Sequence, residues 1–360
     1  MLQKTLKLAQ KYGWNLATKA LLFSLLNLSG RIIDEYLYAS KLSPKNVYMV
    51  KFNELNIPAY LAKVSLKFLG KPAETHLLVA AFDSGLSKDI LMYGIREPLH
   101  TLMLYQIIKK GGFTTILDLG SNIGYFPKIE LMAGAEEIIA FEPIPHTYAI
   151  LHENLKECDR CITINAAIAE CEGNSLIYIP VDAKGLPILN LASMNKESLL
   201  KNPRVAYIYS YEVRTVSFQE ILNKYTPNVI RMDIEGYEWE LFSSLYRIPP
   251  ETKIIDFEVH RGNIKKAKQS LLFLQEEGFL RVIVIVDPNT LNFWIRSAAK
   301  TLHLESALKM YNKFLLSTVP RGYVYDGTPI FKTNLTSIIN NLDVLLSLSG
   351  FIHLILKRER

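Results

Sequence analysis

The middle of the chain alternates short apolar runs with longer amphipathic stretches. Turn residues bound the apolar runs, which is typical of strands that are buried on both faces. They predict strands at residues 115–119, 137–141, 161–165, 228–232, 253–257 and 280–286. The stretches between them predict helices at 125–132, 147–157 and 219–225. This alternation indicates βαβ units, so we predict an α/β core over residues 93–287, with a mostly parallel sheet and helices on both faces.

The pattern is different before this core. Residues 1–92 predict a helix over 4–26 and strands over 47–52 and 76–82. Two prolines, Pro58 and Pro72, indicate turns in this zone. We interpret residues 1–92 as an N-terminal helical and β cap or leader.

Two further segments depart from the regular alternation. Residues 169–215 are too long for one crossover and include the strand-like run SLIYIP, so we expect an insertion beside the site. Residues 288–360 predict a C-terminal helical extension. It consists of a helix over 297–316, a turn-rich stretch over 322–331 and a closing apolar helix.

Composition and charge narrow the class of protein. The 360 residues are 49% apolar and 21% charged, which excludes a disordered chain. The net charge of +6 suits an acidic substrate or a membrane surface and does not single out nucleic acid. The apolar stretches 20–28 and 338–356 are too short or too interrupted to predict a transmembrane span. A terminal helix that touches a membrane peripherally and a homo-oligomer both stay open.

Three cysteines, Cys158, Cys161 and Cys171, are too few for the disulfide framework of a secreted protein of this length. We therefore expect reduced thiols and a cytoplasmic location. With His146 and His152 they form a poor metal-ligand pattern, because the C-x-x-C has no second pair. We predict no metal site.

The sharpest motif is LDLGSNIGYF, in which a buried strand runs into a glycine turn and then a helix. It places Asp118, Gly120, Ser121, Asn122 and Gly124 around the turn. Glycine lets a nucleotide-like ligand approach the backbone closely. Because Asn122 stands where the dinucleotide fingerprint has its second glycine, the motif argues against a pyrophosphate. An ordinary tight turn is the alternative.

Glu142 directly follows the predicted strand 137–141 and lies 142 − 118 = 24 residues after Asp118. This is close to the offset of about 20 residues at which an acidic side chain reaches a ribose diol. A carboxylate can accept hydrogen bonds from both ribose hydroxyls, so Glu142 is a candidate ribose ligand. The alternative is an interaction with the dipole of the following helix.

Acidic residues and a histidine follow the next two predicted strands of the core. Asp233 and Glu235 come after strand 228–232, and Glu258 and His260 come after strand 253–257. Ligands of open α/β sheets bind at the carboxyl ends of the strands, so these four side chains are candidate catalytic residues. A structural ion-pair network that includes Arg231 is the alternative.

Five motifs in order, LDLGSNIGYF, FEPIP, NAAI, RMDIEGYEWELF and DFEVH, resemble the FkbM family of S-adenosylmethionine-dependent methyltransferases. The resemblance runs from about residue 93, where YGIREP resembles the lead-in segment, to about 286. It implies a class I methyltransferase (Rossmann-like) fold that binds S-adenosyl-L-methionine. It also implies that Gly120, Asn122 and Gly124 lie near the methionine moiety, that Glu142 holds the ribose, and that Asn165 and Ala166 border the adenine.

We therefore predict an enzyme that methylates a hydroxyl of a sugar, a glycan or a small metabolite. Asp233, Glu235 and His260 are the candidate bases, and Glu258 is the candidate orienting group. An N- or nucleic-acid methyltransferase is one alternative, although an acidic sheet edge would repel phosphates. A catalytically inactive nucleoside-binding scaffold is the other. Three tyrosines at strand spacing in the insertion, Tyr207, Tyr209 and Tyr211, suit a sugar platform or a packed strand face.

Overall fold

The computed structural model describes residues 42, 47–66, 73–81, 83, 85–183, 185, 187–200, 205–260, 262–286, 330–347 and 352–359. The helices predicted over 4–26 and 297–316, Pro72 and most of the turn-rich stretch 322–331 lie outside these residues. The described elements belong to one compact unit, Pro44–Asp287 with Ile330–Arg360.

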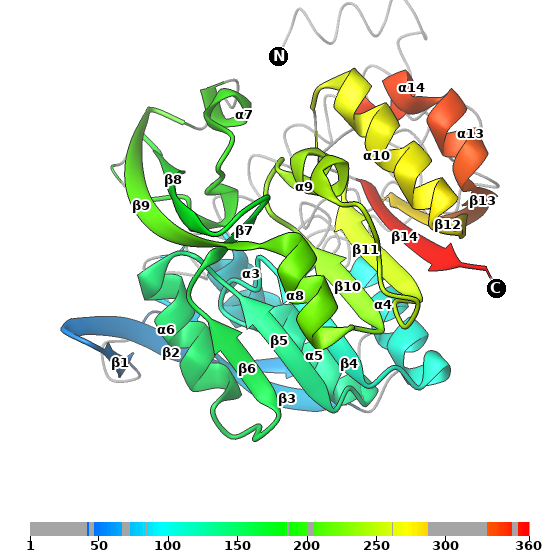
Figure 1. Cartoon of the computed structure of the whole chain (residues 1–360). Coiled ribbons are helices and arrows are strands. Elements are labelled where there is room, and N and C mark those ends of the chain that lie inside the picture. Colours follow the sequence, from blue (N-terminus) through cyan, green and yellow to red (C-terminus); the bar gives the residue numbers. More distant parts are fainter. Residues whose placement is uncertain are drawn as a thin grey trace, which may run out of the picture. The chain divides into compact units, whose positions relative to one another are not determined.

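The centre of this unit is an eight-stranded sheet with the order β13-β12-β14-β11-β10-β4-β5-β6 (Figure 1). Its strands are β4 (Thr115–Leu119), β5 (Glu137–Phe141), β6 (Cys161–Ile164), β10 (Val229–Met232), β11 (Ile254–Glu258), β12 (Phe279–Val286), β13 (Ile330–Asn334) and β14 (Ile352–Arg358). The run from β6 to β11 is parallel, whereas β14 is antiparallel to both of its neighbours. The predicted α/β class with a mostly parallel sheet is confirmed.

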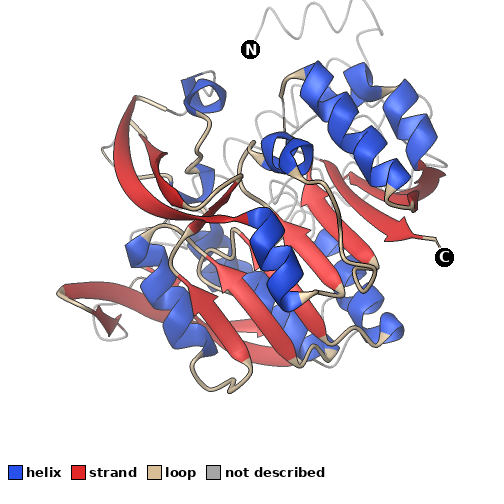
Figure 2. Ribbon diagram, in the orientation of Figure 1, coloured by secondary structure: helices blue, strands red, loops and turns tan. Residues whose placement is uncertain are grey.

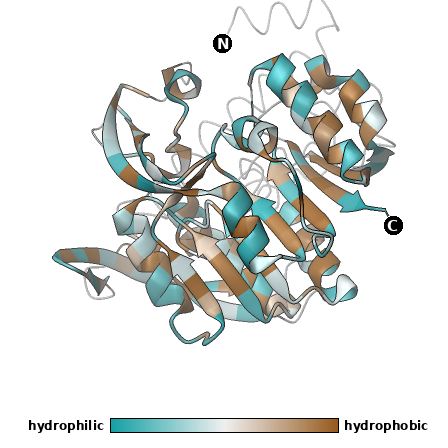
Figure 3. Ribbon diagram, viewed as in Figure 1, coloured by the Kyte–Doolittle hydropathy of each residue, from teal (hydrophilic) through white to brown (hydrophobic). Residues whose placement is uncertain are grey.

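The predicted strands of the core match the observed ones to within about one residue at each end. β4, β5 and β10 are buried along almost their whole length, because helices cover both faces of the sheet. Figure 3 shows the apolar residues concentrated in these central strands. Continuous apolar runs in the sequence therefore predicted these strands correctly.

Helices lie on both faces of the sheet, with α8 in front of it and α4 behind it in the view of Figures 1 and 2. The helices of the core are α4 (Pro98–Gly111), α5 (Tyr125–Ala133), α6 (Pro145–Leu155), α8 (Phe218–Tyr225), α9 (Glu238–Ser244) and α10 (Ile264–Glu276). The three predicted helices correspond to α5, α6 and α8. Ser217 begins α8 by accepting a hydrogen bond from the Glu220 N–H, and Asn263 caps α10 in the same way.

The strand order reverses at β4. The chain goes from β4 to β5 and β6 on one side, and later to β10 and β11 on the other. The chain therefore leaves β4 and β10 toward opposite sides of the sheet. Such a switch point is where open α/β sheets bind their ligands.

The predicted insertion is a separate three-stranded sheet with the order β7-β9-β8. It consists of β7 (Ala167–Ala169), β8 (Gly173–Val181) and β9 (Tyr207–Ser217), with the short helices η3 (Leu189–Leu191) and α7 (Lys196–Leu200) between the last two. Ile177, Ile179 and Val213 of this sheet pack against Ile144 of the core. The insertion is thus held to the carboxyl side of the central sheet.

The N-terminal zone contributes a third sheet, β1-β2-β3, and helix α3 (Leu86–Tyr93). Its strands are β1 (Val47–Phe52), β2 (Leu55–Ser65) and β3 (Glu74–Ala80). The turn predicted at Pro58 is wrong, because this residue lies within β2, opposite Met49. Proline has no N–H to donate. β3 ends at Ala80, opposite Ala59, so an N–H at position 58 would face only the end of that strand.

Asn154 of α6 joins the N-terminal sheet to the glycine turn of the core. Its amide exchanges hydrogen bonds with the backbone of Leu78 and donates to the Ile123 carbonyl at 2.7 Å. This buried link fixes α6 against both segments.

The C-terminal segment departs from the prediction. The apolar helix expected over 338–356 is wrong in its second half, because 352–358 form β14 between β11 and β12. Among the described residues of this segment, α13 (Leu335–Asn340) and α14 (Leu342–Ser347) are the helices that precede it. A strand with a partner on each side forms backbone hydrogen bonds with both partners. A local apolar pattern does not reveal partners that lie far away in the sequence.

The expectation of three reduced cysteines is also wrong. Cys158 and Cys161 form a disulfide after α6, with a Cα–Cα distance of 5.3 Å, and Cys171 is free and exposed. The C-x-x-C spacing brings the two Cα atoms within the range that a disulfide requires.

No helix among the described residues is both long enough and apolar enough to cross a membrane.

Candidate active site

A pocket opens at the carboxyl edge of the central sheet, where the switch point was expected. Eight of the predicted site residues line it: Gly120, Ser121, Asn122, Glu142, Ala166, Asp233, Glu235 and Glu258. The insertion supplies part of the opposite wall through Ile177, Leu189, Ser193 and Met194. The sequence motifs that follow β4, β5, β10 and β11 therefore meet in one cavity.

Gly120 lies where the loops after β4 and β10 approach each other most closely. Its φ of +78° is left-handed, and a Cβ at this position would lie 2.0 Å from the backbone oxygen of Asp233. The N–H groups of Gly120 and Ser121 both donate to the Phe141 carbonyl, at 3.1 and 2.9 Å. No other residue type fits this turn, so glycine sets the shape of the pocket floor.

Asn122 and Glu142 are joined directly. Asn122 adopts a left-handed φ of +51°, and its N–H donates to Glu142 Oε2 at 3.1 Å. The Ile144 N–H donates to Glu142 Oε1 at 2.9 Å. Burial raises the pKa of Glu142 to about 7, against the opposing effect of these two backbone donors. Each carboxylate oxygen accepts one protein hydrogen bond and keeps capacity to accept another.

Asp118 lies behind the pocket and does not line it. Its fully buried carboxylate accepts from Ser121 Oγ at 2.8 Å and pairs with Arg231 at 3.2 Å. The other side of the Arg231 guanidinium donates to Asp233 Oδ2 at 3.0 Å. Arg231 lies directly opposite Asp118 in the β4–β10 pairing, so the strand register places these two charged side chains next to each other.

Gly124 and Asn165 also lie outside the pocket lining. Gly124 begins α5 with a φ of +89°, and a Cβ there would lie 3.0 Å from Leu151 Cδ1. The Asn165 amide donates to the Glu142 and Pro143 carbonyls at 2.9 and 3.0 Å. Both residues shape the backbone of the pocket wall.

Asp233 directly follows β10 and faces the pocket. Burial raises its pKa to about 6, Arg231 opposes this rise, and the nearby charge of Glu235 adds to it. Its Oδ1 atom is buried and has no hydrogen-bond partner among the described residues. Glu235 continues the turn with a left-handed φ of +54°, and Ser193 Oγ donates to its carbonyl at 2.6 Å.

His260 lies beside the pocket among three carboxylates. Its Nε2 is 3.3 Å from Glu235 and 3.9 Å from Glu258, and its Nδ1 is 3.1 Å from the fully buried Glu238. Burial alone would lower the pKa of His260, but the charges of Glu238, Glu258 and Glu235 raise it well above its ordinary value. Burial raises the pKa of Glu258 well above its ordinary value as well.

Several polar residues of the pocket lining were not among the predicted site residues. Arg96 and Glu97 enter the pocket lining from the segment before α4. Arg96 bridges Glu97 at 3.1 Å and Asp89 at 2.6 Å. The segment YGIREP could have indicated Arg96 and Glu97, because these two charged residues directly precede a proline at the start of a helix. Ser193 had no such signal, because its position depends on the fold of the insertion.

A parallel sheet with a glycine turn after its first core strand, and a carboxylate after its second, defines the class of nucleoside-binding α/β enzymes. Residues 118–281 match the model of the methyltransferase FkbM domain. The resemblance stated from the sequence is thereby confirmed over these residues, and with it the class I methyltransferase fold. Residues 118–281 therefore form a domain similar to the methyltransferase FkbM domain.

The chain is also similar to hexuronic acid methyltransferase AglP of Haloferax volcanii, with 26% identity over 160 residues. The similarity covers 43% of this chain, which spans 59% of the length of that relative.

Among solved structures, the methyltransferase of Agrobacterium tumefaciens has 10% identity and a TM-score of 0.30, with 62% of this chain and 63% of that chain covered. Phosphoethanolamine N-methyltransferase 2 of Haemonchus contortus, solved with S-adenosyl-L-methionine, has 12% identity and a TM-score of 0.31. That similarity covers 88% of this chain and 72% of that chain. Scores of this size do not distinguish one function from another.

Proposed function

We propose that the protein binds S-adenosyl-L-methionine in this pocket and methylates a hydroxyl of a sugar, a glycan or a small metabolite. One observation carries the proposal. Asp233 Oδ1 lies at the pocket wall beside Gly120 and has no hydrogen-bond partner in the described part of the chain. S-adenosyl-L-methionine supplies an electrophilic methyl group on a sulfonium.

The residues of the pocket fit this cofactor. Gly120 keeps the pocket floor free of side-chain atoms where a ligand must approach the backbone. Glu142 has the acceptor capacity that two ribose hydroxyls require, and Ala166 adds a small apolar wall beside it. Asp118, Gly124 and Asn165 hold the surrounding backbone in place. We infer a positioning role for these three residues.

Asp233 is the base that we favour among the four candidates. A pKa of about 6 leaves its carboxylate ionised at neutral pH while it can still accept a proton from the acceptor hydroxyl. Burial raises the pKa of Glu258, and the surrounding carboxylates raise the pKa of His260, which favours the protonated form of both. We assign them, with Glu235, to orienting Asp233 and the acceptor.

A sugar acceptor is supported by a row of aromatic side chains beside the pocket. Tyr207, Tyr209 and Tyr211 of β9 are 55%, 43% and 45% exposed. Tyr211 lies opposite Ile177 across the β8–β9 pairing, and Ile177 lines the pocket. Opposite residues of an antiparallel pair share a face, so these tyrosines extend the pocket wall as a surface for a sugar ring. The relative from Haloferax volcanii acts on a hexuronic acid, which agrees with this choice.

The test is methyl transfer from labelled S-adenosyl-L-methionine to a panel of acceptors. The panel contains hexuronic acids, neutral sugars and lipid-linked glycans, with RNA and a lysine-rich peptide as the contrasting classes. We expect label on a sugar oxygen. Label on nitrogen, or on RNA alone, would favour the N- or nucleic-acid methyltransferase. Binding of the cofactor without transfer to any acceptor would favour the inactive scaffold.

A further inference from the structure

We propose that Glu97, His100 and His353 form a binding site for a divalent transition-metal ion of the zinc class, between the start of α4 and β14. This site is separate from the residues assigned to methyl transfer and does not depend on that function. No local sequence pattern indicates this site, because the ligands come from segments more than 250 residues apart.

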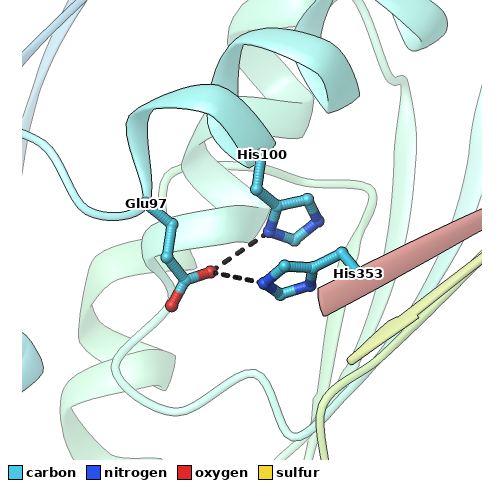
Figure 4. A group of neighbouring side chains, drawn as sticks. All are labelled: Glu97, His100 and His353. Atoms are coloured by element: carbon cyan, nitrogen blue, oxygen red, sulfur yellow. Dashed lines mark hydrogen bonds and ion pairs between the residues drawn. The ribbon is translucent and has the colours of Figure 1, made fainter. Parts of the chain in front are cut away.

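The spacing of the donor atoms fits zinc. Glu97 Oε2 lies 3.2 Å from His100 Nδ1 and 3.5 Å from His353 Nε2, and the three donor atoms all lie within 4.8 Å of one another (Figure 4). Ligands held about 2.0–2.1 Å from a tetrahedral zinc are separated by roughly 3.3 Å. The two distances to Glu97 are therefore already those of ligands around one ion.

His100 is held in place for this role. His100 Nε2 lies 2.7 Å from Asp256 Oδ2, which leaves Nδ1 directed at Glu97. A carboxylate behind a ligating imidazole is the usual arrangement at protein zinc sites, because it fixes the tautomer and the ring. The two imidazoles stack at 3.8 Å with an angle of 19° between them, so one ring must turn for both to direct a nitrogen lone pair at the same ion. In Figure 4 both rings present a nitrogen to the same Glu97 oxygen.

The cluster formed by Glu97, His100 and His353 is accessible to an ion from the pocket. His100, His353 and Asp256 are almost fully buried, whereas Glu97 is 14% exposed at its side chain and lines the pocket. An ion can thus reach the histidines from the pocket side. Glu97 shares Arg96 with Asp89, and His100 lies between the carboxylates of Glu97 and Asp256. A divalent ion bound at His100 Nδ1 would take the place of a proton between the imidazole and Glu97.

The donor set selects the class of ion. Two imidazoles and one carboxylate suit zinc and its neighbours in the first transition row, whereas magnesium and calcium prefer oxygen ligands. A second group, Asp233, Glu235 and His260, also has donor atoms within 4.8 Å of one another. It has one imidazole and two carboxylates, and its two carboxylates line the pocket proposed for methyl transfer, so we favour the first group.

The experiment titrates the full chain, stripped with a chelator and dialysed, with zinc against a chromogenic chelator. Cobalt replaces zinc in a parallel titration, because its absorption spectrum reports imidazole ligation. The variants are Glu97→Gln, His353→Gln and Asp256→Asn. The matched controls are His152→Gln, an exposed histidine on α6, and His260→Gln in the second group.

We expect the wild type to bind about one zinc per chain, unaffected by excess magnesium. His353→Gln and Glu97→Gln should each weaken zinc binding at least 100-fold, and Asp256→Asn roughly 10- to 100-fold. Both controls should bind as the wild type does. Circular dichroism identifies a variant that fails to fold, and Glu97→Gln, whose side chain reaches the pocket, serves as the second variant in that case.

Three results would overturn the proposal. Zinc that does not bind to the folded wild type would identify the cluster as an ion-pair network. Equal binding by the wild type and the folded Glu97→Gln variant would exclude this site. Loss of binding in His260→Gln alone would assign the ion to the second group. None of these measurements uses methyl transfer, so failure here is separate from failure of the proposed function.

Discussion

Asp233 is the residue whose charge the proposed reaction needs most, and its pKa predicts a pH dependence. The base works only when ionised, so kcat at saturating S-adenosyl-L-methionine should fall about tenfold per pH unit below about pH 6 and level off above it. Asp233→Asn keeps the shape and removes the charge. Turnover should then fall by roughly 10²- to 10⁴-fold, and the acidic limb of the profile should disappear.

Initial rates of labelled methyl transfer from pH 5 to 8, for both proteins, check this prediction. Cofactor affinity measured by calorimetry is the control, and it should change little. An Asn variant with wild-type turnover would mean that proximity and alignment suffice without a base.

Gly120 offers a second test at the residue scale, with Gly112 as its matched partner. Both have left-handed φ values, +78° and +60°, but a Cβ at Gly112 meets nothing within 4 Å. Gly112→Ala should cost about 1–2 kcal/mol of unfolding free energy from backbone strain alone. Gly120→Ala adds the clash with the Asp233 carbonyl and should cost at least a further ~1–3 kcal/mol.

Urea unfolding of the two variants measures these costs. Equal destabilisation would show that the loops after β4 and β10 do not approach as closely as the structure has them. Cofactor affinity should also fall in Gly120→Ala and remain unchanged in Gly112→Ala.

At the scale of elements, β14 makes the C-terminus part of the central sheet. Leu356 is fully buried, and the next residue, Lys357, is exposed. Leu356→Ala should lower the unfolding free energy by about 2–5 kcal/mol, whereas Lys357→Ala should stay within about 0.5 kcal/mol of the wild type. Chemical denaturation of both variants checks this. A small effect of Leu356→Ala would contradict a strand buried between β11 and β12.

The same element shows what the sequence could and could not predict about the fold. β4, β5 and β10 were predictable, because each is a short apolar run between turn residues and owes its burial to flanking helices. Residues 352–356 are equally apolar, but they follow a helical stretch and lie far in sequence from their partners. Their strand conformation depends on β11 and β12, which no local pattern reveals.

The residues of the site also differ in whether the sequence could predict them. Glu142 and Asp233 were predictable as pocket residues, because each directly follows a core strand at the ligand-binding edge. His100 and His353 were not, since one lies inside an amphipathic helix and the other inside an apolar run. Only the packing of α4 against the sheet brings them together with Glu97.

For the whole molecule, the role of the N-terminal segment stays a prediction. Its amphipathic pattern over residues 4–26 indicates an apolar face that must be covered, by assembly or by a lipid surface. Deletion of residues 1–29 should therefore cause aggregation, a changed oligomer size or a loss of lipid binding. Sedimentation and liposome flotation measure these effects. A truncated protein that behaves as the full chain in both would contradict the prediction.

The central claim is that the pocket at the carboxyl edge of the sheet binds S-adenosyl-L-methionine through Glu142. The most direct measurement is calorimetry with S-adenosylhomocysteine at pH 8, where a group with a pKa of about 7 is ionised. Glu142→Ala should weaken binding roughly 10- to 150-fold, from the ~1.5–3 kcal/mol of hydrogen bonds to a charged group. Glu157→Ala, an exposed carboxylate beyond α6, should bind as the wild type does. Wild-type protein that releases no binding heat, or a Glu142→Ala variant of unchanged affinity, would contradict the account.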